Sequence, residues 1–257
     1  MEAAVARDRL SEALLDDDCL NALWALVDSG VAAQIIPELP ALALEQDPIH
    51  KHKDVLAHTI AVTAKTRADL VLRLAALFHD IGKPLTRKID DDGVTFRHHE
   101  AVGAKMAKKR LRQLEYPDDV VSDVAELVRL SGRFKGYASG WSDSAVRRYA
   151  RDAGHLLGLL NELVRSDCTT RNQRKRLELH HHVDAIEERI LDLAAQDRRK
   201  AERPLIDGQT VMDRFDVGPG PTVGQALKFL LELKRSEPDL DIAATEDRLD
   251  QWWSTNS

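Results

Sequence analysis

The stretch Leu74-Ala75-Ala76-Leu77-Phe78-His79-Asp80-Ile81-Gly82-Lys83-Pro84 decides the fold of this chain. An apolar run ends at a His-Asp pair, and the glycine and proline that follow are helix-stop signals. The pattern predicts a buried helix over residues 69–81 that carries an imidazole and a carboxylate at its polar end. Because such a pair is suited to binding a metal or transferring a proton, we expect the rest of the chain to assemble around it.

The composition is typical of a soluble protein rich in helix. Of the 257 residues, 43% are apolar, 31% are charged and 5% are aromatic, and this length allows one large domain or two smaller ones. The first residues lack the basic start and apolar core of a signal peptide, and no apolar run approaches the ~20 residues of a membrane helix. Two cysteines give no disulfide framework. These features predict a cytoplasmic protein with no membrane partner.

Apolar residues recur at helical spacing along most of the chain. Two prolines break the stretch 35–42, which reads as a packed connector, and an Asp-Asp-Asp-Gly turn signal within 88–96 indicates a small hairpin or a loop. Helices are expected within residues 11–29 (two short ones), 53–67, 69–81, 100–114, 117–130, 142–150 and 174–199. The sequence therefore predicts an all-α fold.

Histidines and carboxylates recur at intervals along the chain. The set His58, His79, Asp80 and Asp167 resembles the metal-binding signature of HD-domain phosphohydrolases. In that family, two imidazoles and two carboxylates surround a divalent cation and leave positions open for water and phosphate. The resemblance implies that these four residues bind Mg, Mn, Ni, Co or Fe, and that a metal-bound water acts as the nucleophile.

Two more residues near the signature match positions that assist in the family. Lys83 resembles the lysine that reaches substrate phosphate in many members, although a surface cation after a helix end is the alternative. His99 resembles the start of a His-x-x-x-Gly-Ala helix that, in binuclear members of the family, supplies a ligand for a second metal ion. Ser131 stands where those members have a further histidine, so His99 is also a candidate to contact phosphate or a metal-bound water. The resemblance assigns Asp80, Lys83 and His99 to catalysis, and the last two also to substrate binding.

A basic run follows Asp167. It either contacts the phosphates of RNA or substrate or faces solvent, and we include Arg171 and Arg174 as candidate substrate-binding residues. The consecutive histidines 180–182 point in three directions on a helix and cannot share one ion, so a solvated face is expected there.

The resemblance extends beyond the metal signature. Segments that look like the C-terminal half of actinobacterial CCA-adding tRNA nucleotidyltransferases occur at 38–42, 50–59, 143–148, 165–172, 207–209, 218–221 and 252–253. The catalytic head is not recognisable, because the chain has no Gly-Ser strand start and no predicted strand that carries an Asp-x-Asp pair for nucleotide and magnesium. Asp16-Asp17-Asp18 lies at the end of an amphipathic helical piece instead. The resemblance implies N-terminal helices and a connector at 1–46, an HD-domain helical bundle at 47–172, and a helical C-terminal body or tail module at 173–257.

The resemblance implies a metal-dependent phosphohydrolase. Its expected substrates are phosphomonoesters or 2′,3′-cyclic phosphates of nucleotides or RNA ends. Two alternatives stay open. One is a non-catalytic module that binds tRNA or other RNA, and the other is a hydrolase of nucleoside triphosphates or guanosine tetraphosphate, since these enzymes share the HD site.

Overall fold

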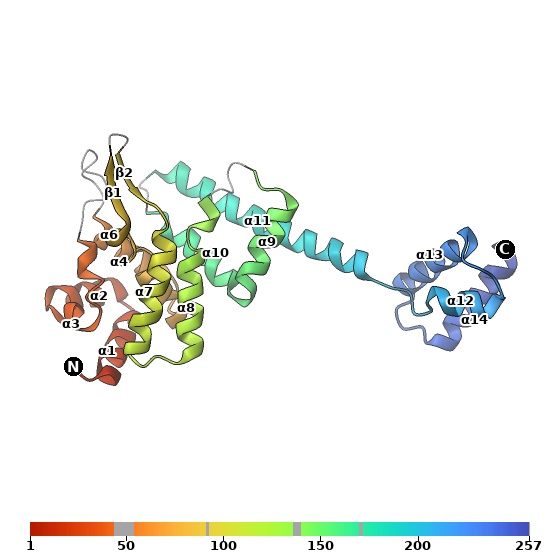
Figure 1. The fold of residues 1–257 in the computed structure, drawn as a ribbon, viewed down its shortest axis with the longest axis horizontal. Helices are drawn as coiled ribbons and strands as arrows, with labels where there is room; N and C mark the ends of the chain where they lie inside the picture. Colours follow the sequence, from red (N-terminus) through yellow and green to blue (C-terminus); the bar gives the residue numbers. More distant parts are fainter. Residues whose placement is uncertain (44–53, 91–92, 136–139, 170–171, 257) are drawn as a thin grey trace. The chain divides into compact units, whose positions relative to one another are not determined.

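The computed structural model describes residues 1–43, 54–90, 93–135, 140–169 and 172–256 (Figure 1). As the sequence predicted, these residues are mostly helical, with one short hairpin among them. The elements are α1 (Ala3–Leu15), α2 (Cys19–Asp28), α3 (Val31–Ile35), η1 (Pro40–Leu42), α4 (Val55–Lys65), α5 (Leu70–Phe78), α6 (Lys83–Thr86), β1 (Arg87–Asp90), β2 (Gly93–Phe96), α7 (His99–Gln113), α8 (Asp118–Leu130), α9 (Asp143–Ala153), η3 (Gly154–Leu156), α10 (Leu157–Asp167), α11 (Gln173–Ala201), α12 (Gly208–Phe215), α13 (Pro221–Ser236) and α14 (Ile242–Asn256).

The chain divides into two compact units, Met1–Ile190 and Leu191–Ser257. The long helix α11 contributes residues to both. We keep the finer division at residues 46 and 172, expected from the sequence, as a proposal. In the described parts of both units, no helix is long and apolar enough to cross a bilayer.

Helix α5 is the centre of the first unit. Its N-cap Asp69 accepts a hydrogen bond from the backbone nitrogen of Leu72 at 3.0 Å, and all residues from Leu72 to Phe78 are buried. Helices α1, α4, α8 and α10 pack around it. A helix that is apolar on all sides is stable when neighbours cover all sides. The bundle therefore holds the C-terminal end of α5, where His79 lies, in its interior.

A charged side chain is accommodated within this bundle. Arg73 is buried in α5, and its guanidinium donates to the backbone carbonyl oxygens of Leu14, Asp16 and Thr66. These carbonyls end α1 and α4, where helices leave acceptors without partners of their own. Because helix C-terminal ends also carry partial negative charge, Arg73 joins three helices without an unpaired buried charge.

Some helices differ from the sequence prediction. Helix α1 begins at Ala3, well before residue 11, because its first turns bury small residues such as Ala6 that give a weak apolar signal. Helix α10 was not predicted as a helix of its own. Its apolar residues follow η3 without a break, so the sequence shows no clear start signal. Of the two alternatives that the sequence left open for residues 88–96, a hairpin or a loop, the structure has the hairpin, since β1 and β2 pair antiparallel with Lys88 opposite Thr95.

The second unit has a small core of its own. Helices α12, α13 and α14, with Ile206 from the segment before α12, contribute its buried side chains, which are Ile206, Val211, Val223, Ala226, Leu230 and Leu249. Two aromatic stacks enclose this core, Phe215 on Trp253 and Phe229 on Trp252, with ring centroids 4.1 Å and 5.5 Å apart. The tryptophans near the C-terminal end of the sequence thus pack inside this unit.

Candidate metal centre

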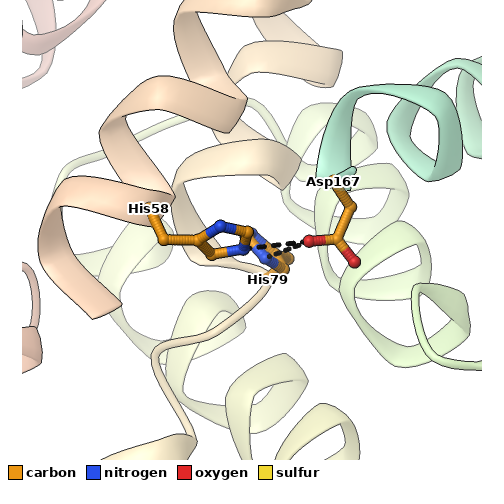
Figure 2. A group of neighbouring side chains, drawn as sticks. All are labelled: His58, His79 and Asp167. Atoms are coloured by element: carbon orange, nitrogen blue, oxygen red, sulfur yellow. Dashed lines mark hydrogen bonds and ion pairs between the residues drawn. The ribbon is translucent and has the colours of Figure 1, made fainter. Parts of the chain in front are cut away.

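Side chains from three helices of the first unit converge on one point (Figure 2). His58 lies in the first turn of α4, His79 follows the last residue of α5, and Asp167 ends α10. The Asp167 Oδ1 atom lies 3.0 Å from His58 Nε2 and 3.4 Å from His79 Nε2. One potential ligand atom from each residue lies within 4.8 Å of the other two. Figure 2 shows both rings directed at the Asp167 carboxylate.

Asp80 brings a fourth potential ligand to the same point. Its Oδ2 atom lies 3.3 Å from His79 Nε2 and 3.8 Å from His58 Nε2. Ligands bound at about 2.0–2.2 Å to one tetrahedral or octahedral ion are about 2.8–3.6 Å from their neighbours. The measured separations are close to this range, so the four side chains fit a shared divalent cation.

The Nδ1 atoms of His58 and His79, which face away from the shared point, are hydrogen-bonded to neighbouring groups. His79 Nδ1 donates to the carbonyl oxygen of Ala76 at 2.6 Å. His58 Nδ1 lies 2.9 Å from the Thr169 hydroxyl. When Nδ1–H is donated in this way, the lone pair of a neutral ring is on Nε2, which is the state that binds metals. The surroundings therefore orient both rings as ligands.

The Nε2 atom of His79 is the clearest indication of a cation. It is buried and has no aligned hydrogen-bond partner in the part of the chain that the structure describes, although oxygens of Asp80 and Asp167 are near it. Burial opposes protonation of this ring, but attraction by Asp80 and contacts with Asp167 outweigh it and raise the pKa of His79 to about 10. The two carboxylates thus favour positive charge at this point, which a divalent cation would supply.

Both carboxylates are held in their ionised form. Burial opposes ionisation of Asp80, yet the neighbouring His79 and Lys83 lower its pKa well below the usual range. Burial opposes ionisation of Asp167 as well, and its bonds to His58 and His79 lower its pKa. The two groups are therefore available as anionic ligands throughout the physiological pH range.

Lys83 and His99 both lie against Asp80. Lys83 Nζ donates to Asp80 Oδ2 at 2.6 Å, and its side chain is buried, so the alternative of a surface cation is wrong. His99 Nε2 lies 3.5 Å from Asp80 Oδ1, and its Nδ1 donates to the Phe96 carbonyl oxygen at 2.8 Å. Burial lowers the pKa of His99. Asp80 therefore faces His79 with one oxygen and His99 with the other.

These groups open into a cavity of about 260 Å³, which we call the metal cavity. Its lining residues are His58, His79, Asp80, Lys83, His99, Ser131, Gly132, Lys135, Asp167, Cys168 and Thr169. Ser131 is in this lining, as its correspondence to a family ligand suggested, but its hydroxyl donates to the Val128 carbonyl oxygen at 2.9 Å. Lys135 and Thr169 were not anticipated, because a lone lysine or threonine carries no sequence signal for a site.

Of the two basic residues predicted to bind substrate, only Arg174 is among the described residues, and it does not line this cavity. Arg174 is exposed at the start of α11 and lines a separate open hollow. Arg171 lies outside the described residues. A role for either in substrate binding stays a proposal.

Thr169 offers a test of how the histidine is oriented. Thr169→Val keeps the shape of the side chain but removes the oxygen next to His58 Nδ1. Loss of a partner of this kind lowers metal affinity by about 10-fold or more, and we expect that decrease in Mn²⁺ affinity measured by electron paramagnetic resonance. Thr169→Ser, which keeps the hydroxyl, is the matched control. Equal affinity of the valine and serine variants would exclude this positioning role.

Comparison with known proteins gives one family and several relatives. The model of the HD domain family matches residues 55–217, well over half of the chain. A protein named CC-adding tRNA nucleotidyltransferase from Thermus thermophilus is 36% identical over 245 residues, covering 90% of this chain and 53% of the relative. A protein named A-adding tRNA nucleotidyltransferase from Deinococcus radiodurans is 31% identical over 237 residues, covering 89% and 53%.

A shorter match covers part of the chain. A protein named Multifunctional CCA protein from Pseudomonas paraeruginosa is 32% identical over 136 residues, which is 50% of this chain and 31% of that relative. The chain thus spans about half the length of the first two curated relatives and less of the third. The similarity to nucleotidyltransferases implied by the sequence motifs is confirmed.

Proposed function

The chain belongs to the HD domain family, and from this premise we propose that it is a metal-dependent phosphohydrolase. Its proposed substrates are phosphomonoesters or 2′,3′-cyclic phosphates of nucleotides or RNA ends. His58, His79, Asp80 and Asp167 are the proposed metal ligands. The observation that carries this proposal is the buried Nε2 of His79. It has no hydrogen-bond partner among the described residues and lies 3.3 Å and 3.4 Å from oxygens of the ionised Asp80 and Asp167 carboxylates.

The donor set and the cavity support this chemistry. A divalent cation held by these four residues would lower the pKa of a water molecule and neutralise charge on the phosphoryl oxygens. Lys83 keeps Asp80 oriented through its 2.6 Å hydrogen bond and adds positive charge to the cavity wall. Because its Nδ1 hydrogen is donated to Phe96, neutral His99 has a lone pair on Nε2 that can accept a proton from a water molecule in the cavity. Once protonated, the same nitrogen can donate to a phosphate oxygen.

Metal removal tests the proposal directly. Protein dialysed against a chelator is expected to release no phosphate from the proposed esters, and addition of Mn²⁺, Mg²⁺, Ni²⁺, Co²⁺ or Fe²⁺ is expected to restore turnover. Phosphate release is measured for phosphomonoesters, 2′,3′-cyclic nucleotides, nucleoside triphosphates and guanosine tetraphosphate. Turnover of the last two compounds alone would favour the alternative hydrolase class. Turnover that does not depend on metal would contradict the proposed mechanism.

The names of the relatives support a second candidate function, the binding of tRNA. On this alternative, the chain binds tRNA and hydrolyses no phosphate ester. The net charge of −6 gives no general attraction to nucleic acid, so binding would depend on a local basic surface. Affinity for tRNA that falls steeply with salt, together with no turnover in any metal, would favour this function over hydrolysis.

A further inference from the structure

A second cavity of about 260 Å³ adjoins the metal cavity and is formed by the end of α8, the end of α10 and α11, all within the first unit. Its lining residues are Ser131, Phe134, Lys135, Val164, Asp167, Cys168, Leu179 and His182. Four of them, Ser131, Lys135, Asp167 and Cys168, also line the metal cavity. The proposed metal ligand Asp167 therefore belongs to the walls of both cavities.

The walls that belong to the second cavity alone are mostly apolar. They are formed by Phe134, Val164 and Leu179, with the His182 side chain as a polar member. The Phe134 ring is buried, and its centroid lies 6.3 Å from that of the Tyr149 ring. Packing against Tyr149 therefore fixes Phe134 in the cavity wall. A site with apolar walls and a few polar groups is typical of pockets for organic ligands.

The polar groups lie where the two cavities meet. Lys135 is in both linings and has a largely exposed side chain, 66% accessible, with Nζ 3.8 Å from a Glu100 carboxylate oxygen. A flexible ammonium at this junction is suited to a phosphate or a ribose hydroxyl. The sequence had suggested a solvated face for the three histidines of α11, but His182 is only half-exposed and lines this cavity.

We infer that the second cavity binds the nucleoside part of a phosphate ester whose phosphate lies in the metal cavity. This inference rests on the proposed function and narrows its substrate class. A nucleoside has apolar ring faces and polar edges, which match the apolar walls and the polar junction. The volume of about 260 Å³ is below the roughly 300–1,000 Å³ of pockets for drug-sized ligands, so the cavity holds no more than one nucleoside. The proposed substrates are therefore mononucleotides and the terminal nucleotide of an RNA.

Filling the cavity tests this assignment. Leu179→Trp places a larger side chain in the cavity wall. Displacing the base from the Phe134 ring in this wall is expected to lower kcat/KM for the best-hydrolysed ribonucleoside 3′-monophosphate by about 10-fold or more. Hydrolysis of methyl phosphate, which has no nucleoside, is expected to stay within about twofold. Mn²⁺ affinity is expected to be unchanged, because Leu179 is not among the residues of the metal cavity.

Leu177→Trp is the matched control. It is the same substitution on the same helix, but Leu177 is exposed and does not line the second cavity. The control is expected to behave as the unmodified protein with all four ribonucleoside 3′-monophosphates. Equal loss with both classes of substrate in Leu179→Trp, or no loss with either, would overturn the nucleoside assignment.

A binding measurement separates this inference from the proposed function. Saturation-transfer NMR with adenosine, guanosine, cytidine and uridine reports occupancy of the cavity without any hydrolysis. Binding of at least one nucleoside that is lost in Leu179→Trp and kept in Leu177→Trp supports the assignment even if the protein hydrolyses nothing, in which case only the proposed function fails. Absence of nucleoside binding to the unmodified protein, with methyl phosphate still hydrolysed, rejects the assignment and leaves the phosphohydrolase proposal in place.

Discussion

His79→Ala combined with Asp80→Ala is expected to lower metal-stimulated phosphate release by about 1,000-fold or more. The variant removes two of the four proposed ligands, including the buried nitrogen that lies between the carboxylates. A bound metal stabilises the charge of the transition state by several kcal/mol. Because each 1.4 kcal/mol of activation free energy changes the rate about tenfold, loss of the metal should lower the rate by about 1,000-fold or more. Phosphate release and Mn²⁺ binding are the measurements, with far-ultraviolet circular dichroism as the check on helical content.

A second, more conservative variant distinguishes loss of the metal site from loss of the fold. Asp167→Asn keeps the shape of the side chain but removes the negative charge that faces His58 and His79. Because the Asp167 side chain is 37% exposed, the variant is expected to fold normally. It should lose Mn²⁺ affinity by about 100-fold. Asp119→Asn is the matched control, because Asp119 is exposed on α8 and does not line the metal cavity. Unchanged turnover in the double variant or in Asp167→Asn would contradict the proposed ligand set.

Gly82→Ala is expected to have the largest structural effect in the signature. A Cβ atom at this position would lie 2.1 Å from the His99 carbonyl oxygen and 2.8 Å from the Gly103 nitrogen. Both are backbone atoms of α7, so the contact is relieved only if the helix moves. Overpacking of this kind costs about 2–3 kcal/mol, and displacement of His99 by about 1 Å is expected to lower turnover by about 10- to 100-fold.

Chemical denaturation and phosphate release measure the two effects of Gly82→Ala separately. Gly158→Ala in α10 is the matched control, because its Cβ would meet nothing within 4 Å. Removing a glycine from a helix is expected to raise stability slightly, by no more than about 1 kcal/mol. If Gly82→Ala were as stable and as active as the control, the close approach of α6 and α7 would not be what positions His99.

Asp167 comes from a helix that is fastened to α11 as well as to α5. Arg165, two residues earlier on α10, donates to Glu187 and Asp184 of α11 at 2.7 Å each. Asn161 donates to the same glutamate at 2.9 Å and accepts from the Tyr149 hydroxyl at 2.7 Å. Because these bonds join α9, α10 and α11, they fix the helix that carries the carboxylate shared by the two cavities.

The local signals in the sequence were sufficient for most of the helices. The buried helix α5 follows from an apolar run with a glycine-proline stop, whereas the turn residues near β1 and β2 allowed either a hairpin or a loop. Helix α10 was missed because its apolar residues have no distinct start, although it carries Asp167. Asp167 was identified from the resemblance to HD-domain proteins and not from helical periodicity.

The sequence could not indicate which neighbours complete the site. Thr169 and Lys135 reach the metal cavity only because α10 ends beside α4 and the residues after α8 fold over the same point. The burial of Lys83 was equally hidden, since a lysine after a helix end is usually exposed. Its place follows from the packing of α6 against α7 and from the charge of Asp80.

By itself, the sequence determined that the protein is helical, that it belongs with the HD domain proteins, and which four side chains are the proposed ligands of a divalent cation. Periodicity and caps act within one helix, so they are readable from the order of residues. The tertiary structure decided the separations of 3.0–3.8 Å between those side chains, the orientation of their rings and the apolar cavity beside them. These depend on contacts between residues distant in the chain, which only the packing of the helices around α5 creates.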